Sequence, residues 1–516
     1  MQHAKMRIAG VITVLAAVSC LLGRAFAREL YVSPTGTPTN DGSQEKPLDL
    51  TTALSARSPA RPGDTIYLMA GTYEGPLKER DGKTERLPFE FAVSGSAEKP
   101  IRVMPAPGAT VHINGTVELT SSHVHYIGLE IGDLRWDPEQ KTHRNQPALN
   151  ATAGTQAKFI NCNLFGGSMG TGIWRGAIDF EMYGCLVHDF GTLGADRGHG
   201  HAVYTQNDTG TKRYEHNIFY RGCGWNFDIY GQQGQMRGFD VIENISYAGG
   251  WYKPGQVSFS YGISGYQPAD RVRFLGNVAY QPRDGQRWRG NFRLIVHQRK
   301  EVSHVSGEVR DNYIMGGWRG FGLGYWKDIT VTGNTIWSTG IIAEIAAAPG
   351  GAGINDPALP RPDLKNYHFD NNTYYDNGQP KPFRYGGGVE KESEEELLTF
   401  AEWQALGLDR NGRMLPGRNG RPTGTKVFIF PNKYQKGRAH LAVFNWDDLE
   451  QVEVDLSPAL APGQRYQVYN CLNIKQTIAL ARPVAEGVWQ GGKVALPMKK
   501  DAASPQFDAF LVLPVE

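Results

Sequence analysis

One short stretch of the 516-residue chain concentrates side chains that can donate, accept or hold a proton. Imidazole, phenol and carboxyl groups are the usual general acids and bases of enzymes. Six residues that carry one of these groups or a side-chain amide fall between positions 199 and 208: His199, His201, Tyr204, Gln206, Asn207 and Asp208. Their density makes the segment from Gly198 to Asp208 one candidate centre for a catalytic site.

A second candidate centre emerges when residues are counted back from a recurring asparagine. The positions 13, 14, 16 and 15 residues before four successive asparagines hold Tyr204, Tyr230, Tyr261 and His297. If Val203 and Ile229 point inward, strand alternation directs Tyr204 and its equivalents outward as one row. The same alternation points His201 inward, unless a bulge at Gly200 resets it. An internal aromatic stack is the alternative interpretation of the row.

The asparagines themselves belong to a repeat. An apolar residue, two arbitrary residues and an asparagine recur at steps of 54, 27, 33, 35, 22 and 38 residues. The first step has room for an imperfect copy with Tyr183 or Gly184 in the asparagine position. Such periods predict stacked units that bury their apolar faces against one another, and the runs between them are β-prone. The repeated residues are Asn163, Asn217, Asn244, Asn277, Asn312, Asn334 and Asn372.

One asparagine-centred phrase per turn, with unequal insertions, resembles the right-handed parallel β-helix of the pectin-lyase-like superfamily. The resemblance implies an asparagine ladder at a bend, in which each amide bonds the next asparagine and nearby backbone. The opening segment, with strands near Tyr31 and at Gly63–Tyr73, is similar to the capped first turn of secreted β-helix proteins. The expected fold class is all-β, a right-handed parallel β-helix followed by a small antiparallel β-sandwich.

Composition divides the chain into four predicted segments. Residues 1–27 have the pattern of a signal peptide, and residues 28–379 are expected to form the β-helix with its N-terminal cap. Residues 380–424 are expected to be a connector, with a helix at 394–406. Six short strands without an asparagine repeat predict the sandwich at 425–516, which resembles accessory domains of carbohydrate-active enzymes.

The net charge and the predicted signal peptide indicate where the protein is located and which classes of partner it binds. Lys5 and Arg7 precede an apolar run, Ile8–Leu22, that is too short to favour a membrane span. Without the three basic residues of this segment the formal net charge falls from +2 to −1, which gives no indication of nucleic-acid binding. We expect a secreted or periplasmic monomer that has no membrane span and acts on a polysaccharide or oligosaccharide.

Cysteine spacing predicts neither a metal site nor a disulfide framework. Four cysteines remain after the signal segment, and the default expectation is free buried thiols. Cys162 and Cys185 flank their repeat positions on opposite sides, so they need not stack. No cofactor is predicted, and Ca²⁺ is left open. The four are Cys162, Cys185, Cys223 and Cys471.

The region around the row is cationic and aromatic. Residues 195–330 hold 17 Lys and Arg against 12 Asp and Glu, and five of the eleven Trp. Because Arg binds carboxylates in a forked geometry and aromatic rings stack on sugar faces, an acidic sugar chain is the predicted ligand. The residues assigned to substrate binding are His199, Gln206, Asn207, Asp228, Tyr261, Arg299, Trp251 and Trp288.

Cleavage of a uronate chain by β-elimination needs three groups. One neutralises the carboxylate, one removes the C5 proton, and one protonates the leaving oxygen. Arg293 or Arg299 is assigned to the first role. His297 or Lys300, with His201 as the alternative centre, is assigned to the second. Tyr204 or Tyr230 is assigned to the third.

Two other functions stay open. A glycoside hydrolase would pair Asp228 with Asp196 or Asp208, and a non-catalytic glycan-binding protein would need neither. Gly198-His199-Gly200 is similar to a motif of polygalacturonases, but the Asn-Thr-Asp and Asp-Asp carboxylates of that family do not precede it. An Asp-rich calcium cluster like that of pectate lyases is not evident in the sequence either.

Overall fold

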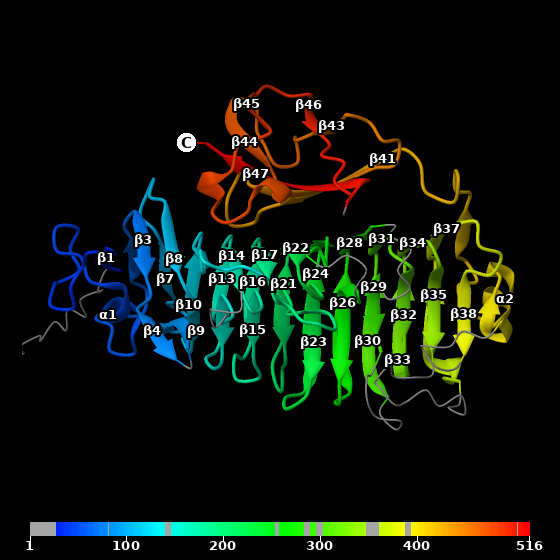
Figure 1. Cartoon of the computed structure of the whole chain (residues 1–516), viewed down its shortest axis with the longest axis horizontal. Coiled ribbons are helices and arrows are strands. Elements are labelled where there is room, and N and C mark those ends of the chain that lie inside the picture. Colours follow the sequence, from blue (N-terminus) through cyan, green and yellow to red (C-terminus); the bar gives the residue numbers. More distant parts are fainter. Residues whose placement is uncertain are drawn as a thin grey trace, which may run out of the picture.

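The protein is a right-handed parallel β-helix with an antiparallel β domain along one side (Figure 1). The structure is a computed structural model that describes residues 27–80, 82–139, 146–252, 257–282, 289–295, 303–346, 361–386, 394–502 and 504–515. Over these residues three sheets of 12 strands run the length of the coil, all parallel except for one terminal pair, β38 with β39. The fold predicted from the asparagine repeat is confirmed.

Each turn of the coil contributes one strand to each sheet. The first sheet contains β1 (Glu29–Val32), β2 (Thr65–Leu68), β7 (Ile101–Pro105), β10 (Val124–Ile127), β13 (Lys158–Ile160), β16 (Glu181–Tyr183), β21 (Lys212–Glu215), β24 (Met236–Ile242), β27 (Ala269–Leu275), β30 (His304–Arg310), β33 (Trp326–Thr332) and β36 (Tyr367–Asp370). The second contains β3 (Gly71–Glu74), β8 (Val111–Asn114), β11 (Glu130–Gly132), β14 (Asn163–Gly167), β17 (Leu186–Phe190), β22 (Ile218–Gly222), β25 (Ile245–Tyr247), β28 (Val278–Gln281), β31 (Tyr313–Gly316), β34 (Thr335–Trp337), β37 (Thr373–Tyr375) and β40 (Arg413–Leu415). The third contains β6 (Phe89–Phe91), β9 (Val117–Leu119), β12 (Leu149–Ala151), β15 (Thr171–Ile173), β20 (Val203–Thr205), β23 (Phe227–Gly231), β26 (Ser258–Gly265), β29 (Arg289–Leu294), β32 (Arg319–Leu323), β35 (Ile341–Ala346), β38 (Phe383–Gly386) and β39 (Leu397–Leu398). Two hairpins project from the coil, β4 (Leu77–Arg80) with β5 (Lys83–Arg86) and β18 (Thr192–Leu193) with β19 (Gly198–His199).

The bend between the first and second sheets carries the asparagine ladder. The amide of Asn244 donates to Asn277 Oδ1 at 3.0 Å and to the carbonyl of Tyr214 at 2.9 Å, and the backbone N–H of Asn244 also donates to Asn277 Oδ1. The same pattern repeats from Asn217 to Asn372, which donates to Asp409 at 2.8 Å. Because these amides are buried, the ladder satisfies backbone groups that the bend would otherwise leave unpaired.

A left-handed residue precedes each ladder position and makes the sharp bend possible. Such backbone favours Gly, Asn and Asp, although His and Glu also occur here. The residues with positive φ immediately before the ladder are Asn161, Gly184, His216, Glu243, Gly276, Asp311, Gly333 and Asn371.

The ladder continues through two cysteines rather than through Asn163. Asn163 pairs with Leu186, which places Cys162 and Cys185 in the ladder position. Cys185 N–H donates to Asn217 Oδ1 at 2.9 Å, and Cys162 N–H lies 3.4 Å from Cys185 Sγ. The expectation that Asn163 is a ladder member is therefore wrong, and the two cysteines, whose stacking the sequence left open, occupy adjacent ladder positions. The four described cysteines are buried free thiols, as predicted.

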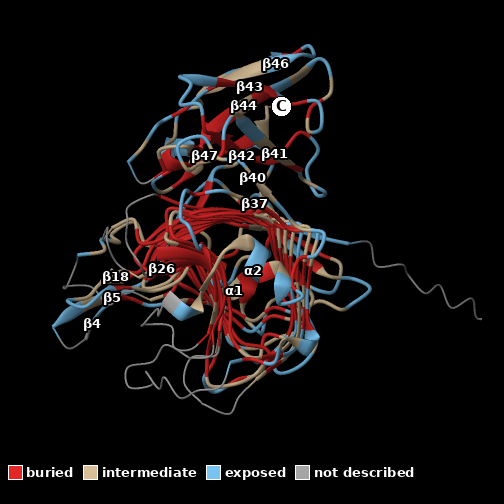
Figure 2. Ribbon diagram, turned by 90° about the vertical axis from the view of Figure 1, so that its right-hand side faces the viewer, coloured by how far each residue is buried: buried red, intermediate tan, exposed pale blue. Residues whose placement is uncertain are grey.

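Two short helices close the ends of the coil (Figure 2). Helix α1 (Leu50–Leu54) starts at Asp49, whose carboxylate accepts the Thr52 N–H, and it buries its apolar face on the first turn. Helix α2 (Phe400–Ala405) has a capping box from Thr399 and buries Trp403. The expected helix at 394–406 is shorter, because a 3-10 turn and the strand β39 occupy its first half. The 3-10 turns are η1 (Leu364–Asn366), η2 (Glu394–Glu396), η3 (Cys471–Asn473) and η4 (Ile478–Leu480).

The antiparallel domain packs on the outer face of the second sheet (Figure 2). A five-stranded sheet faces a two-stranded one across a shared apolar core. Rings on the outside of the second sheet, such as Tyr247 and Tyr280, contact Phe507 of this domain. The strands are β41 (Thr425–Pro431), β42 (Ala439–Asn445), β43 (Gln451–Asp455), β44 (Gln464–Asn470), β45 (Ala485–Trp489), β46 (Lys493–Pro497) and β47 (Phe507–Pro514).

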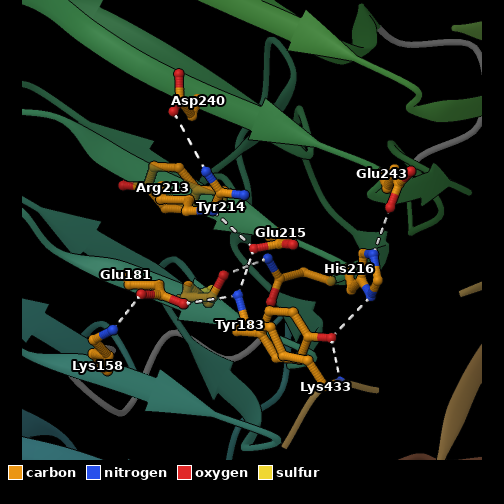
Figure 3. Close-up of polar contacts among 12 residues, drawn as sticks. Lys158, Glu181, Tyr183, Arg213, Tyr214, Glu215, His216, Asp240, Glu243 and Lys433 are labelled. Atoms are coloured by element: carbon orange, nitrogen blue, oxygen red, sulfur yellow. Dashed lines mark hydrogen bonds and ion pairs between the residues drawn. The ribbon is translucent and has the colours of Figure 1, made fainter. Parts of the chain in front are cut away.

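Ion pairs fasten one edge of this interface. The Lys433 ammonium lies 2.7 Å from Glu215 and 3.3 Å from Glu181, and it stands 4.2 Å from the centre of the Tyr183 ring (Figure 3). His216 bonds Tyr183 on one side and Glu243 on the other (Figure 3). Carboxylates of two successive turns of the coil therefore converge on one lysine of the C-terminal domain.

We predict that Asn244→Ala and Asn277→Ala each lower the free energy of unfolding by roughly 1–3 kcal/mol, because buried ladder partners lose their hydrogen bonds. Thermal or denaturant unfolding measures the effect. The matched control is Asn366→Ala at an exposed position. Melting of both ladder variants at the wild-type temperature would contradict the ladder's role.

We predict that a chain ending before residue 425 becomes insoluble or aggregates. Removing the C-terminal domain exposes the apolar and aromatic outer face of the second sheet, and large exposed patches of this kind promote association. Sedimentation of the shortened chain checks the outcome. A monodisperse, monomeric product would show that the covering is dispensable.

Candidate functional site

The outer face of the third sheet holds a polar row that the pairing register fixes. Tyr204 pairs with Asp228, Asp228 with Gly262, and Gly262 with Arg293. Successive members of a parallel row lie about 4.8 Å apart, so their side chains share one surface. A Cβ at Gly262 would stand 2.6 Å from the Trp225 ring, which shows that the glycine makes room for this indole.

Two tyrosines and a histidine lie together at one end of this row. The Tyr204 and Tyr230 rings stack with centroids 5.2 Å apart, and both side chains are half-buried. The His201 ring lies 5.2 Å from Tyr204, and its Nε2 lies 4.0 Å from an oxygen of Asp228. Strand β23 therefore supplies Tyr230 and Asp228, while β20 and the residues before it supply Tyr204 and His201.

A left-handed Gly200 resets the alternation and turns His201 outward. Gly200 has φ 95°, and the two following residues, Ala202 and Val203, both pack in the core of the coil. Since two consecutive residues face inward, His201 and Tyr204 emerge on the same outer face. This is the reset that the sequence left as a condition for a role of His201.

Burial keeps the His201 imidazole neutral. Desolvation lowers the pKa of His201 to about 3, and the charges of Arg197 and His199 lower it further. Its Nδ1 is buried without a hydrogen-bond partner in the described part of the chain. The other ring nitrogen, Nε2, lies 4.0 Å from Asp228, and a neutral imidazole can accept a proton at one of its nitrogens.

Asp228 is shifted in the opposite direction. Burial raises the pKa of Asp228 to about 7, against the lowering effects of Ser264, Arg293 and Arg197. The Ser264 hydroxyl lies 2.9 Å from both carboxylate oxygens. Near neutral pH this carboxyl group exists in both protonation states, which is the range in which a carboxyl group can act as an acid or a base.

Cationic and aromatic groups surround these residues. The Arg293 guanidinium carbon lies 5.9 Å from the centre of the Trp225 ring and 5.3 Å from that of Phe259. Trp174 packs edge-on against Tyr204 at 5.5 Å. Such a face offers rings for sugar stacking next to a cation for a carboxylate.

A buried lysine positions part of this aromatic surface. Lys212 is fully buried, and its ammonium donates to the carbonyls of Ile173, Trp174 and Gln206 at 3.1, 2.6 and 2.5 Å. Burial lowers the pKa of Lys212. Through these three hydrogen bonds, Lys212 holds in place the backbone that carries Trp174 and Gln206.

Several residues assigned from the sequence lie elsewhere. Tyr261 pairs with Phe227, and its ring is in the core of the coil, so its place in the outward row is wrong. Asn207 is fully buried, and its amide donates to the carbonyls of Gly210, Arg237 and Gly238, so its assignment to substrate binding is also wrong. Trp251 packs at the second sheet, against the cluster that includes the C-terminal domain.

The remaining assigned residues are distributed as follows. His199 stands on the β18–β19 hairpin with its Nε2 3.0 Å from Asp196. Gln206 is almost fully buried beside Gly234. Asp208 accepts the N–H of Gln235 at the turn after β20. Four residues lie outside the described part of the chain, namely Trp288, His297, Arg299 and Lys300.

The sequence did not single out Trp174 or Ser264 for this face, and Trp225 is one of the five Trp of residues 195–330 that the sequence did not place individually. Ser264 becomes visible from the pairing register, because it pairs with Tyr230 on the neighbouring strand. Trp174 and Trp225 become visible from their ring contacts with Tyr204 and His201. Among the described residues, no group of three or more His, Cys, Asp or Glu side chains is arranged to hold a metal ion. None of the helices found there is long and apolar enough to cross a membrane.

Comparison with known proteins gives local likeness to two pectate lyases. The chain is 32% identical over 114 residues, 20% of its length, to pectate lyase L of Thermoclostridium stercorarium, and 33% identical over 107 residues, 21% of its length, to pectate disaccharide-lyase of Dickeya chrysanthemi. These matches span 9% and 12% of the two relatives, about a tenth of their length. No family model matches the chain.

Solved structures with a similar chain path include the pectate lyase Pel9A. That structure superposes with a TM-score of 0.43 and 15% identity, covering 66% of this chain and 84% of its own. The architecture of the present chain, with three long parallel sheets wound into one coil, is that of a parallel β-helix.

We predict that Asp228→Asn raises stability at pH 8 by roughly 1–4 kcal/mol and that the gain disappears toward pH 4. The folded state holds the Asp228 proton up to about pH 7, whereas an unfolded aspartate loses it near pH 4, so wild-type stability falls as pH rises between these values. Unfolding curves across this window measure the effect. Glu90→Gln, at an exposed position of the third sheet, is the control. An equal pH profile for Asp228→Asn and wild type would contradict the buried carboxyl.

Proposed function

We propose that the protein is an exported polysaccharide lyase that cleaves an acidic, uronate-containing chain by β-elimination at the outer face of the third sheet. One observation carries the proposal: the neutral imidazole of His201, the phenol of Tyr204 and the guanidinium of Arg293 share a face with Trp225. The local likeness to two pectate lyases supports the same reaction class.

The proposed reaction divides three tasks among these residues. Arg293 binds the uronate carboxylate and so acidifies the C5 proton. His201 takes this proton, the C4–O4 bond breaks as the C4=C5 bond forms, and Tyr204 donates its proton to the leaving O4. The proton then returns from His201 to Tyr204, either directly or through water. The centroids of the two rings are 5.2 Å apart.

The low pKa of His201 belongs to the ligand-free site. A carboxylate bound nearby favours the imidazolium and raises the pKa of His201 toward the working range of a general base. Tyr204 keeps its proton, because burial and the nearby Asp228 carboxylate raise the pKa of the phenol. Tyr230, stacked on Tyr204, is the second candidate for the acid. His297 and Lys300 stay candidates for the base.

A glycoside hydrolase is the second candidate function, and Asp228 supports it. A carboxyl group with a pKa of about 7 is suited to protonate a leaving oxygen. Its partner would be Asp196, on the hairpin, or Asp208, at the turn after β20. Glycan binding without cleavage is the third.

We predict that digestion of a panel of acidic polysaccharides releases reducing ends together with the ultraviolet absorbance of unsaturated uronates. Tyr204→Phe and His201→Ala are expected to lower kcat by roughly two or more orders of magnitude without a change in melting temperature. Tyr67→Phe, on the outer face of the first sheet, is the matched control.

Other outcomes select the alternatives. Reducing ends without absorbance would indicate the hydrolase, and retained binding without either product would indicate a glycan-binding protein. If His297→Ala abolishes turnover while His201→Ala does not, the base is His297. Full activity of both the Tyr204 and His201 variants would rule out the third-sheet site as we describe it.

A further inference from the structure

A cavity of about 610 Å³ lies between the second sheet and the C-terminal domain, apart from the row on the third sheet. We propose that this cavity is a second binding site, which holds a negatively charged segment of a uronate-containing oligosaccharide without cleaving it. The identity of this ligand class rests on the proposed function. The cavity itself follows from the way the two domains meet.

The β-helix wall of the cavity is built at a left-handed bulge. Asp189 and Arg221 have φ of 50° and 52° in strands β17 and β22. The bulge places Asp189 beside its neighbour His188, with Nδ1 and Oδ2 2.7 Å apart, although adjacent residues of a regular strand face opposite ways. Positive φ at two non-glycine residues costs free energy, and such strain is concentrated at functional sites.

The opposite wall is a segment of the C-terminal domain that the β-helix holds in place. The Arg221 guanidinium donates to the carbonyl of Leu472 at 2.8 Å and to that of Ile474 at 2.6 Å. The Asn163 amide donates to the carbonyl of Gln476 at 2.8 Å. These bonds fix the backbone on both sides of Lys475, which lines the cavity. The site therefore exists only when both domains are present.

Charge in the cavity favours an anion. The Asp189 carboxylate is already bound by Arg221, His188 and the hydroxyl of Tyr252, and Asp133 is paired with Arg135. Lys475 and Lys499 also line the cavity, and both are exposed. Burial raises the pKa of the neighbouring Asp508 carboxyl, the charge of Lys499 lowers it, and no ion pair of either ammonium is found among the described residues. With its carboxylates neutralised, the cavity presents two ammonium groups to a ligand.

Aromatic rings favour a sugar as the carrier of that negative charge. Trp136 and Tyr252 pack edge to face at 5.4 Å, and Trp251 lines the same space. The Trp136 indole N–H donates to the carbonyl of Gly191, which fixes this ring against the chain just before the β18–β19 hairpin. Rings beside cations match the alternating apolar faces and carboxylates of a uronate chain.

The test is ligand binding to the full-length His201→Ala chain, measured by titration calorimetry with short oligomers of galacturonate, mannuronate and guluronate. We expect two bound oligomers per chain for the preferred uronate. In the same background, Lys475→Gln combined with Lys499→Gln is expected to weaken the second binding event by roughly tenfold or more and to reduce its dependence on salt. Trp251→Ala is expected to weaken the same event.

Two controls isolate the cavity. Lys500→Gln removes the same charge at the neighbouring residue, whose ammonium bonds Glu450, and is expected to leave both binding events unchanged. Methyl-esterified oligogalacturonate keeps the sugar faces but lacks the charge, and is expected to bind weakly at the cavity. Unchanged melting temperatures of the lysine variants exclude unfolding as the cause.

The outcomes separate this inference from the proposed function. One or two bound oligomers whose affinities ignore the lysine pair would overturn the cavity site even if the wild-type chain cleaves uronates. A single bound oligomer whose affinity depends on the lysine pair would uphold the cavity and overturn binding at the third sheet. Two bound oligomers with the expected lysine dependence, in a wild-type chain that releases no product, would uphold the cavity and overturn the lyase. Equal binding of the esterified oligomer at the cavity would overturn the assignment of an acidic ligand.

Discussion

The fixed register between successive turns of the coil is the constraint on which the rest of the structure depends. Only two residues separate β21 from β22, and the second of them, Asn217, donates both its side-chain amide and its backbone N–H to Oδ1 of Asn244 on the next turn. This short bend leaves no freedom for one turn to slip along its neighbour. Every outward position of the three sheets is thereby stacked at strand spacing, and a functional row is built by placing one side chain per turn.

The ladder was predictable from the sequence because its chemistry is local. An amide that must satisfy its own bend and the next one leaves the same residue at the same place in each turn, as Asn277 and Asn312 show. The cysteine continuation was not predictable, since Cys185 accepts and donates weakly and gives no recurring signal. The left-handed residue before each ladder position varies between Gly, Asn, Asp, His and Glu, so the pattern is carried by conformation and not by residue type.

The outward row was only partly predictable, and the reason is loop length. Counting back from the ladder crosses the connection from the third sheet to the first, which differs in length from turn to turn. The paired residues Tyr204, Asp228, Gly262 and Arg293 stand 13, 16, 15 and 19 residues before their asparagines. A constant offset therefore gave the right turns but placed Tyr261, a core residue, in the row. His201 was ambiguous for a different reason, since one left-handed glycine reverses the alternation.

Burial from solvent affects the protonation of the site residues on the third sheet and the stability of the second sheet. On the third sheet it shifts the pKa of His201 and that of Asp228 toward the neutral forms. On the second sheet the C-terminal domain covers the apolar face, and Arg221 ties the two domains together through backbone carbonyls. One domain interface thus stabilises the coil and bounds a cavity, while the third sheet carries the polar row.

We propose that the outer face of the third sheet binds and positions the scissile uronate. A crystal structure of the His201→Ala chain with a bound oligouronate tests it most directly. We expect sugar density along the face of Tyr204, Asp228 and Arg293, with a carboxylate within hydrogen-bonding distance of Arg293 and a glycosidic oxygen near the Tyr204 hydroxyl. Density on another face of the coil, with the third-sheet row free of ligand, would contradict it.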